Sequence, residues 1–281
     1  MKTRREFFKA AGTGMLAVGF ASAYGSPVYA QHQGDARDLF KLGMAGYSFR
    51  EFTVEQTIEM MKRVGVSYIS VKDFHMPYAS TPDQIKSVIS KFRTGGINVY
   101  AVGVVYMKTE QEVDRAFGYA KTAGVKLIVG APDYALLPYV EKKVKEHDIR
   151  LAIHNHGPDN ALFPNSMDIW NNIWDKDRRM GICIDIGHTK RDGKDPVSDI
   201  LKYGSRIFDV HIKDVDGNTK EGKTVEIGRG IIDMPGVITA LRRIGFSGMC
   251  SLEYEKDMKD PLAGIAESLG YFRGVMQCWK G

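Results

Sequence analysis

The chain has 281 residues, and most of its formal net charge of +5 at pH 7 comes from the N-terminus, where Lys2, Arg4, Arg5 and Lys9 face only Glu6. The rest of the chain is almost balanced, with 35 basic and 33 acidic side chains. Nucleic-acid binding calls for a basic stripe that such a chain lacks, so we expect no nucleic-acid partner. The roughly 250 residues beyond the N-terminal segment are the usual size of one barrel domain.

The first thirty residues have the pattern of an export signal. TRREFFK contains paired arginines, a weakly apolar stretch runs from Ala10 to Ala23, and Val28-Tyr29-Ala30 resembles a small-residue cleavage site. The apolar stretch is too short to span a bilayer as a stable helix. We predict a twin-arginine signal peptide over residues 1–30 and a periplasmic domain over residues 31–281, with no stable membrane anchor after signal removal. A basic, unstructured N-terminus is the alternative interpretation.

Eight short apolar runs follow, each typical of a buried strand. They begin at Leu42, Tyr68, Ile97, Val125, Arg150, Met180, Ile207 and Gly248. Segments such as VEQTIEMMKRVG and EQEVDRAFGYAKTAG lie between them, and their apolar residues recur at helical spacing. Alternating strands and helices predict a parallel sheet, and eight units predict a single (β/α)8 TIM barrel of the α/β class. No Gly-x-Gly-x-x-Gly follows the first run, which weighs against a Rossmann fold.

Helix boundaries are also visible in the sequence. Thr53 with Gln56 and Thr109 with Glu112 have capping-box spacing. Thr81-Pro82 and Asp195-Pro196 place a cap residue before a proline suited to the first helical turn. A further set of residues falls where the helices are expected to end, namely Gly65, Gly96, Gly124 and Gly245.

Four polar residues lie near the ends of successive runs: His154, Asp185, His211 and Glu253. In a closed parallel barrel the carboxyl ends of the strands converge on one rim, so these side chains are expected to meet. A single histidine at a strand end is more often a hydrogen-bonded core residue than a ligand, but four such positions together favour a metal site. Imidazole with carboxylate suits a divalent transition metal, with Mn as the leading candidate and Co, Fe, Ni or Zn as alternatives.

Side chains two residues apart on a strand share a face. His156, Lys213 and Glu255 therefore point the same way as the three predicted ligands that precede them and are candidates for the rim above the substrate. Cys183 shares the face of Asp185 and is expected to point into the barrel as a small apolar residue. For Cys250 and Cys278, we favour two buried free thiols over a bridge between the last strand and the last helix.

The segments LAIHNHG, ICIDIGH, DVHIKD, VEIGRGIIDMPGVITALRRIGFSG and SLEYE resemble the xylose isomerase-like TIM-barrel family of sugar phosphate isomerases and epimerases. The resemblance extends over residues 42–278. In that family these strand ends hold a metal through an acidic residue, Asp, His and Glu. This chain departs at the first ligand, where His154 replaces the usual Glu. The resemblance also implies that a homo-oligomer is to be considered.

The departure at His154 bears on the mechanism that the resemblance implies. Tagatose-epimerase members use two metal-bound carboxylates on opposite sides of the sugar, one to remove a proton and one to return it. A metal-bound imidazole is a poor base, so chemistry with one base is favoured here. We expect Glu253 to be the base that removes a proton next to a sugar carbonyl, while the metal stabilises the enediolate.

The remaining candidate residues surround this centre in the predicted barrel. Lys72 and His188 are expected to act as acids or to contact sugar hydroxyls, and the expected substrate contacts are His75, His156, Lys213, Arg229 and Glu255. Ion pairing at the rim, with Asp73, Asp214 or Glu255 as partners, is an alternative role for Lys72 and Lys213. For Arg229, a solvent-exposed loop position is the alternative.

Export bears on the substrate, because sugar phosphates are cytoplasmic metabolites. We therefore expect a free sugar or an oxidised glycoside as the small-molecule partner. An isomerase or epimerase is the leading interpretation, and a lyase or hydratase that cleaves 3-keto-glycosides by β-elimination is the alternative. A non-catalytic periplasmic sugar binder is the third possibility, with a stacking surface formed by Tyr47, Phe49, Phe74, Tyr78 and Tyr106.

Overall fold

The computed structural model describes residues 40–278, so the predicted signal peptide lies outside the described residues. Within residues 40–278, eight parallel strands close into a barrel in the order β1-β10-β7-β6-β5-β4-β3-β2. The barrel strands are β1 (Lys41–Ala45), β2 (Tyr68–Val71), β3 (Asn98–Met107), β4 (Leu127–Pro132), β5 (Arg150–His154), β6 (Met180–Asp185), β7 (Ile207–Ile212) and β10 (Met249–Leu252). This confirms the prediction of a single (β/α)8 barrel.

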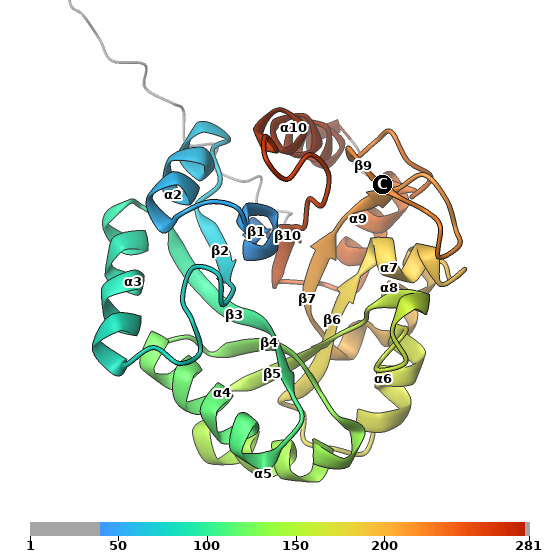
Figure 1. Cartoon of the computed structure of the whole chain (residues 1–281). Coiled ribbons are helices and arrows are strands. Elements are labelled where there is room, and N and C mark those ends of the chain that lie inside the picture. The colour runs from blue at the N-terminus through green and yellow to red at the C-terminus, as the bar shows by residue number, and fades with distance from the viewer. Residues whose placement is uncertain (1–39, 279–281) are drawn as a thin grey trace, which may run out of the picture. The chain divides into compact units, whose positions relative to one another are not determined.

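Helices surround the barrel and cover the outer face of the sheet (Figure 1). They are α2 (Val54–Arg63), α3 (Pro82–Thr94), α4 (Glu110–Ala123), α5 (Leu137–His147), α6 (Ser166–Ile173), α7 (Ile186–Arg191), α8 (Pro196–Tyr203), α9 (Met234–Arg243) and α10 (Leu262–Cys278). Short 3-10 turns η1 (Gly46–Phe49), η2 (Tyr134–Leu136), η3 (Gly157–Asp159) and η4 (Gly204–Arg206) lie in the connections. None of the helices in residues 40–278 is long and apolar enough to cross a membrane.

The predicted helix caps are largely present. Thr53 and Gln56 form a reciprocal capping box at α2. Thr109 accepts the Glu112 N–H at α4, but the Glu112 side chain accepts from the Lys108 N–H instead of the Thr109 N–H. Thr81 and Asp195 cap α3 and α8 as expected. The four glycines predicted at helix ends all have positive φ, which a Cβ would strain.

Most of the predicted strands end earlier than their apolar runs suggest, two of them because a helical turn begins there. After Ala45 the chain turns into η1, and after Asp185 it enters α7 with Asp185 itself as the N-cap, because its carboxylate accepts the His188 N–H at 2.7 Å. The apolar residue Ile186 therefore packs as the start of a helix. This early end places Asp185 at the very mouth of the barrel.

The strand register brings the predicted ligands to the same end of the barrel, within about two residues of one another. His154 of β5 is paired with Cys183 of β6, and Asp185 of β6 is paired with His211 of β7. Glu253 follows the last residue of β10, and its N–H donates to the Ile212 carbonyl. Neighbouring strands thus deliver four polar side chains to one side of the rim.

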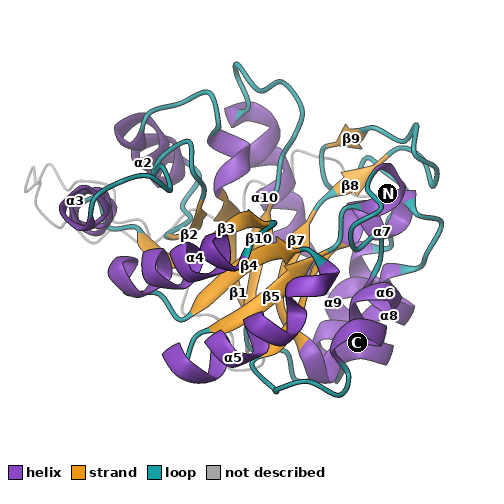
Figure 2. Ribbon diagram, turned by 60° about the horizontal axis from the view of Figure 1, so that its bottom comes forward, coloured by secondary structure: helices purple, strands orange, loops and turns teal. Residues whose placement is uncertain are grey.

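A small hairpin extends beyond β7 beside the barrel mouth (Figure 2). It consists of β8 (Asp214–Val215) and β9 (Thr224–Val225), which pair antiparallel. The Asp214 carboxylate holds the following loop, because it accepts the N–H groups of Val215, Gly228, Gly230 and Ile232. Asp214 is therefore a loop anchor.

The cysteines form no disulfide within residues 40–278. Cys183 and Cys250 are buried, in agreement with the sequence analysis. The prediction of a buried thiol at Cys278 is wrong, because the end of α10 leaves this residue exposed.

Candidate metal centre and active site

The four predicted ligands come together at the C-terminal mouth of the barrel. His154, Asp185, His211 and Glu253 are all buried, and each offers one ligand atom within 4.8 Å of the others. His154 Nε2 lies 3.1 Å from His211 Nδ1, and His211 Nδ1 lies 3.5 Å from Glu253 Oε2. His154 Nε2 is 3.7 Å from Asp185 Oδ2. Modest movements would bring these atoms to the spacing of ligands around one ion.

Local hydrogen bonds fix the position of Asp185. Asn155, on the opposite face of the chain from His154, accepts the Asp185 N–H at 2.8 Å and donates to the Asp185 carbonyl at 3.2 Å. One carboxylate oxygen, Oδ1, is used by the N-cap of α7. The other, Oδ2, is buried and accepts no hydrogen bond among the described residues, although it points at the cluster. Its one close cationic neighbour among the described residues is the Lys213 ammonium, at 3.1 Å, and a buried carboxylate oxygen of this kind is a suitable ligand for a cation.

Lys213 is the cation already present in the cluster. Its Nζ lies 3.1 Å from Asp185 Oδ2, 3.0 Å from Glu253 Oε2 and 3.0 Å from Glu255 Oε2. Burial disfavours the charge, but these three carboxylates raise the pKa of Lys213 well above its usual range. The sequence analysis anticipated an ion pair with Glu255, and the contacts with two of the predicted ligands are additional. A metal ion in this cluster would share both carboxylates with the Lys213 ammonium.

Three carboxylates therefore share one ammonium inside the mouth. Burial raises the pKa of Asp185, although Lys213 opposes this effect. At Glu253 burial also acts upward, but Lys213 and His211 outweigh it and hold the pKa well below its usual range. Burial lowers the pKa of His154 well below 6.5. His154 is therefore neutral, and a divalent cation binds imidazole only in its neutral form.

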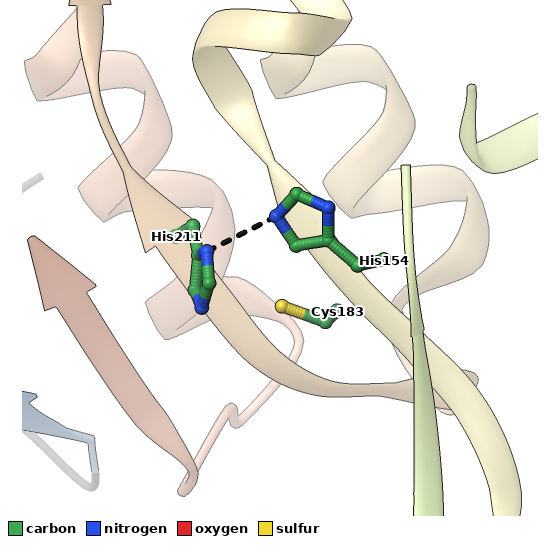
Figure 3. Close-up of side chains that lie close together, drawn as sticks. All are labelled: His154, Cys183 and His211. Atoms are coloured by element: carbon green, nitrogen blue, oxygen red, sulfur yellow. Dashed lines mark hydrogen bonds between the residues drawn. The ribbon is translucent and has the colours of Figure 1, made fainter. Parts of the chain in front are cut away.

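A second polar layer lies directly beneath the predicted ligands. Cys183 Sγ points toward the His154 and His211 rings, which are joined by a hydrogen bond between their nitrogens (Figure 3). These three side chains also lie close enough to share an ion. Asp209, fully buried, accepts hydrogen bonds from the Tyr100 hydroxyl at 3.0 Å and 3.3 Å. Asp209 Oδ2 is 3.9 Å from His211 Nε2. The sequence analysis missed Asp209, although it has the same strand parity as His211.

Histidines and an aromatic ring line the rim above the cluster. The His156 ring lies 4.7 Å from the His154 ring, and His156 Nε2 is 2.6 Å from the Tyr106 hydroxyl. The His188 ring is 5.9 Å from that of His154. Burial lowers the pKa of His156, and burial together with Lys213 lowers that of His188 to about 3. Both imidazoles are therefore neutral groups that can donate or accept hydrogen bonds.

Lys72 lies on the opposite part of the rim. Its Nζ donates to the Val104 carbonyl at 3.0 Å and is 3.5 Å from Asp73 Oδ1, the ion pair considered from the sequence. The ammonium also lies over the rings of Phe74 and Tyr106, at 5.5 Å and 5.9 Å from their centroids. Lys72 is thus held beside the mouth, where a substrate hydroxyl can reach it, and no described contact joins it to the four predicted ligands.

Two of the predicted substrate contacts have partners in other elements and no described contact with the four predicted ligands. His75 is buried away from the cluster, because its Nε2 lies 3.1 Å from the Phe49 carbonyl and 3.2 Å from the Thr57 hydroxyl of α2. Arg229 is exposed and forms a two-point ion pair with Glu267 of α10. The sequence could not reveal these partners, since each lies on an element distant in the chain.

A separate hollow lies at the other end of the barrel. It is lined by residues at the starts of the strands, including Leu127, Arg150, Ile207 and Met249. Barrel enzymes place their chemistry at the C-terminal ends of the strands. The mouth with the polar cluster is therefore the candidate active site.

A family model named for the xylose isomerase-like TIM barrel matches residues 48–275. The chain belongs to this family. The match includes all four strand ends that form the cluster, so the resemblance seen in the sequence segments is confirmed at the level of the family.

Two curated relatives have described roles. Inosose dehydratase from Lacticaseibacillus casei is 21% identical over 254 residues, which cover 74% of this chain and 84% of that protein. The rhizopine catabolism protein MocC from Rhizobium meliloti is 27% identical over 131 residues, or 41% of this chain and 40% of MocC. The chain thus spans less than half of MocC but most of the dehydratase.

Solved structures share the fold across nearly the whole described chain. An uncharacterized protein from Parabacteroides distasonis is 27% identical with a TM-score of 0.66, over 84% of this chain and 99% of that one. The IolI protein, solved with a zinc atom, is 18% identical with a TM-score of 0.71, over 85% and 99%. The 3-keto-D-glucoside 4-epimerase YcjR from E. coli is 14% identical with a TM-score of 0.68, over 84% and 99%.

Replacing Asp209 by Asn is expected to change how stability depends on pH. Burial raises the pKa of Asp209 to about 7 from 3.8, with His211 opposing the effect. Between these values the folded chain binds the proton and the unfolded chain has lost it, so the free energy of unfolding falls as pH rises, by about 4 kcal/mol. Urea denaturation of the chelator-treated protein across this range measures the decline, which the Asn variant should lack. Equal declines in both proteins would contradict this assignment.

Proposed function

We propose that this protein is a divalent-metal-dependent carbohydrate isomerase or epimerase that removes a proton next to a sugar carbonyl. The observation that supports the proposal most strongly is the buried cluster of two imidazoles and two carboxylates at the barrel mouth. The family and the sugar epimerases with the same fold support a carbohydrate substrate. The choice of reaction rests on the residues of the cluster and its rim.

His154 Nε2, His211 Nδ1 and one oxygen each of Asp185 and Glu253 would hold the metal. The donor set fits, because imidazoles and buried carboxylates suit Mn, Co, Fe, Ni or Zn. Asp185 Oδ2 accepts no hydrogen bond among the described residues and has the Lys213 ammonium 3.1 Å away. Against the effect of burial, nearby carboxylates, Glu253 first, raise the pKa of His211, so this imidazole would give up a proton when it binds the ion. When bound, the metal supplies a Lewis acid for the sugar carbonyl and stabilises the negative charge that develops there. Manganese remains the leading candidate, and the zinc of IolI keeps zinc among the alternatives.

Glu253 is the proposed base. Lys213 and His211 outweigh the effect of burial and keep this carboxylate ionised, and one of its oxygens can face the substrate C–H while the other faces the ion. Lys213, held at 3.0 Å from Glu253, would donate to the substrate oxygen that gains negative charge. His156 and His188 would bind sugar hydroxyls as neutral groups, and Lys72 would bind from the far side of the rim.

A lyase or hydratase that cleaves a 3-keto-glycoside is the second candidate. Two-base epimerisation would use a second ligand carboxylate at the position of His154, and this chain lacks it. A single base would therefore both remove and return the proton, as in epimerisation, or only remove it, as in elimination. One relative, aligned over 74% of this chain, is named as inosose dehydratase, and dehydratases act by elimination. Abstraction of the proton is common to both reactions, and a leaving group beside the enolate decides between them.

Two accounts compete with an enzyme of this kind. In one, Lys213 is the permanent counter-ion of the carboxylates, and the cluster takes no metal. In the other, the mouth binds sugar without chemistry. The first account predicts no metal uptake by the natural chain, and the second predicts no proton exchange in the bound sugar. Two separate experiments therefore test them.

Metal titration of the chelator-treated protein is expected to give one strong divalent site per chain. Asp185→Asn should weaken it by more than about 100-fold, because loss of an outer-shell partner alone typically costs about 10- to 100-fold. His147→Gln is the control, since His147 packs on Phe117 away from the mouth. Lys213→Met should bind at least as tightly as the natural chain. Uptake of metal only by the Lys213→Met variant would support the counter-ion account.

Solvent deuterium exchange into bound sugars tests the base. The natural protein should exchange the proton next to the carbonyl of a substrate sugar, and Glu253→Gln should slow this by roughly 100-fold or more, the usual contribution of general base catalysis. Glu255→Gln is the matched comparison, because Glu255 also contacts Lys213 but is outside the predicted ligand set. Nuclear magnetic resonance reads the exchange. A protein that binds sugar without any exchange would be a binder.

We also propose that the protein is exported by the twin-arginine route and acts in the periplasm. TRREFFK and the stretch to Ala30 support this proposal. Changing Arg4 and Arg5 to Lys is expected to abolish export of the full-length chain, as measured by cell fractionation. Export of the double variant at the natural level would overturn the assignment.

A further inference from the structure

Large aromatic rings are exposed beside the mouth of the barrel. Phe74 and Tyr106 are 45% and 46% exposed, and they follow β2 and lie near the end of β3. Tyr47, in η1, packs against Phe74 with their ring centroids 5.8 Å apart. Two other aromatic residues considered from the sequence have structural roles, because Phe49 is in the core and the Tyr78 hydroxyl donates to the Val104 carbonyl. Tyr47, Phe74 and Tyr106 are called the aromatic platform below.

The aromatic platform occupies a different arc of the rim from the metal cluster. The predicted ligands come from β5, β6, β7 and β10, which are consecutive in the barrel, whereas the platform follows β1, β2 and β3 on the remaining arc. Tyr106 connects the two arcs, because its hydroxyl is 2.6 Å from His156, whose ring lies 4.7 Å from that of His154. A sugar ring held over the cluster would therefore have the platform at its side.

Cations accompany the platform rings. The Lys72 ammonium lies over both Phe74 and Tyr106, and the Arg50 guanidinium lies 4.9 Å from the centre of the Tyr47 ring. Exposed apolar rings of this kind, bordered by polar groups that can bind hydroxyls, are typical of surfaces that bind a ligand. The aromatic rings can stack on the flat face of a ligand ring, and the Lys72 ammonium can donate hydrogen bonds to the hydroxyls of that ligand.

We propose that the aromatic platform is a subsite for the second ring of a glycoside, next to the sugar that is deprotonated. This inference rests on the proposed function, because it takes the cluster as the position of the reacting sugar. A glycoside has no free anomeric carbonyl, so the reacting carbonyl lies on another ring carbon. The substrate class is then a keto-glycoside, and simple aldose-to-ketose isomerisation is disfavoured relative to epimerisation or elimination.

Binding of unreactive sugars tests the subsite without requiring turnover. We expect the holoprotein loaded with Mn²⁺ to bind phenyl β-glucoside or cellobiose roughly 5- to 10-fold more tightly than methyl β-glucoside, the gain expected of one stacked ring. Phe74→Ala and Tyr47→Ala should each remove most of this difference and leave the affinity for methyl β-glucoside nearly unchanged. Calorimetry measures all three ligands. Tighter binding of phenyl β-glucoside than of cellobiose would indicate that the second ring of the natural substrate is aromatic. Tighter binding of cellobiose would indicate that it is a sugar.

Trp174→Ala is the matched control, because Trp174 is a 62% exposed aromatic residue after α6. It should keep the full preference for two-ring ligands. Equal affinity for one-ring and two-ring ligands, or an equal loss of both in Phe74→Ala, would overturn the subsite. The preference with no deuterium exchange in any keto sugar would leave the subsite standing and contradict the proposed function. Deuterium exchange without a preference for two-ring ligands would support the proposed function and contradict the subsite.

Discussion

Buried negative charge at the mouth of the barrel is the constraint on which the rest of the site depends. Asp185, Glu253 and Glu255 share the single ammonium of Lys213, and the first two are removed from solvent almost completely. Buried carboxylates are costly unless they are paired or bind a cation. Because the imidazoles of His154 and His211 adjoin these carboxylates, a divalent ion bound by all four side chains satisfies more of this charge than Lys213 can satisfy alone. The proposed chemistry follows from that ion and from the carboxylate beside it.

Strand register brings the four side chains of the cluster together, and the residues around the cluster orient them. Asn155 and the N-cap of α7 hold Asp185, while Asp209, bound by Tyr100, lies under His211. His156 and His188 rise above the cluster as neutral groups, and the aromatic platform extends the mouth on the other arc. In the proposed function, His154 stands where the resemblance implies an acidic ligand, and Glu253 is the one carboxylate that acts as a base. A substrate with a second ring and an enolisable ketone suits this arrangement.

The sequence predicted the barrel and the four strand-end residues because both depend on short-range patterns. Alternating apolar runs and caps define the units, and parity along a strand decides which side chains share a face. The same parity rule could have identified Asp209, which is two residues before His211 on β7. The partners of His75 and Arg229, and the contacts of Lys213 with Asp185 and Glu253, could not be identified in this way, because each is decided by packing between elements far apart in the chain. Residues 1–30 lie outside the described part, so their export role stays a prediction.

X-ray diffraction from crystals grown with Mn²⁺ tests the central claim most directly, because anomalous scattering locates the ion. The account predicts one peak per chain, with His154 Nε2, His211 Nδ1, Asp185 and Glu253 at about 2.0 to 2.3 Å, the usual range for nitrogen and oxygen ligands of such metals, and with Lys213 still bound to Glu255. A map with no peak at saturating Mn²⁺, and with the Lys213 ammonium between Asp185 and Glu253, would contradict it.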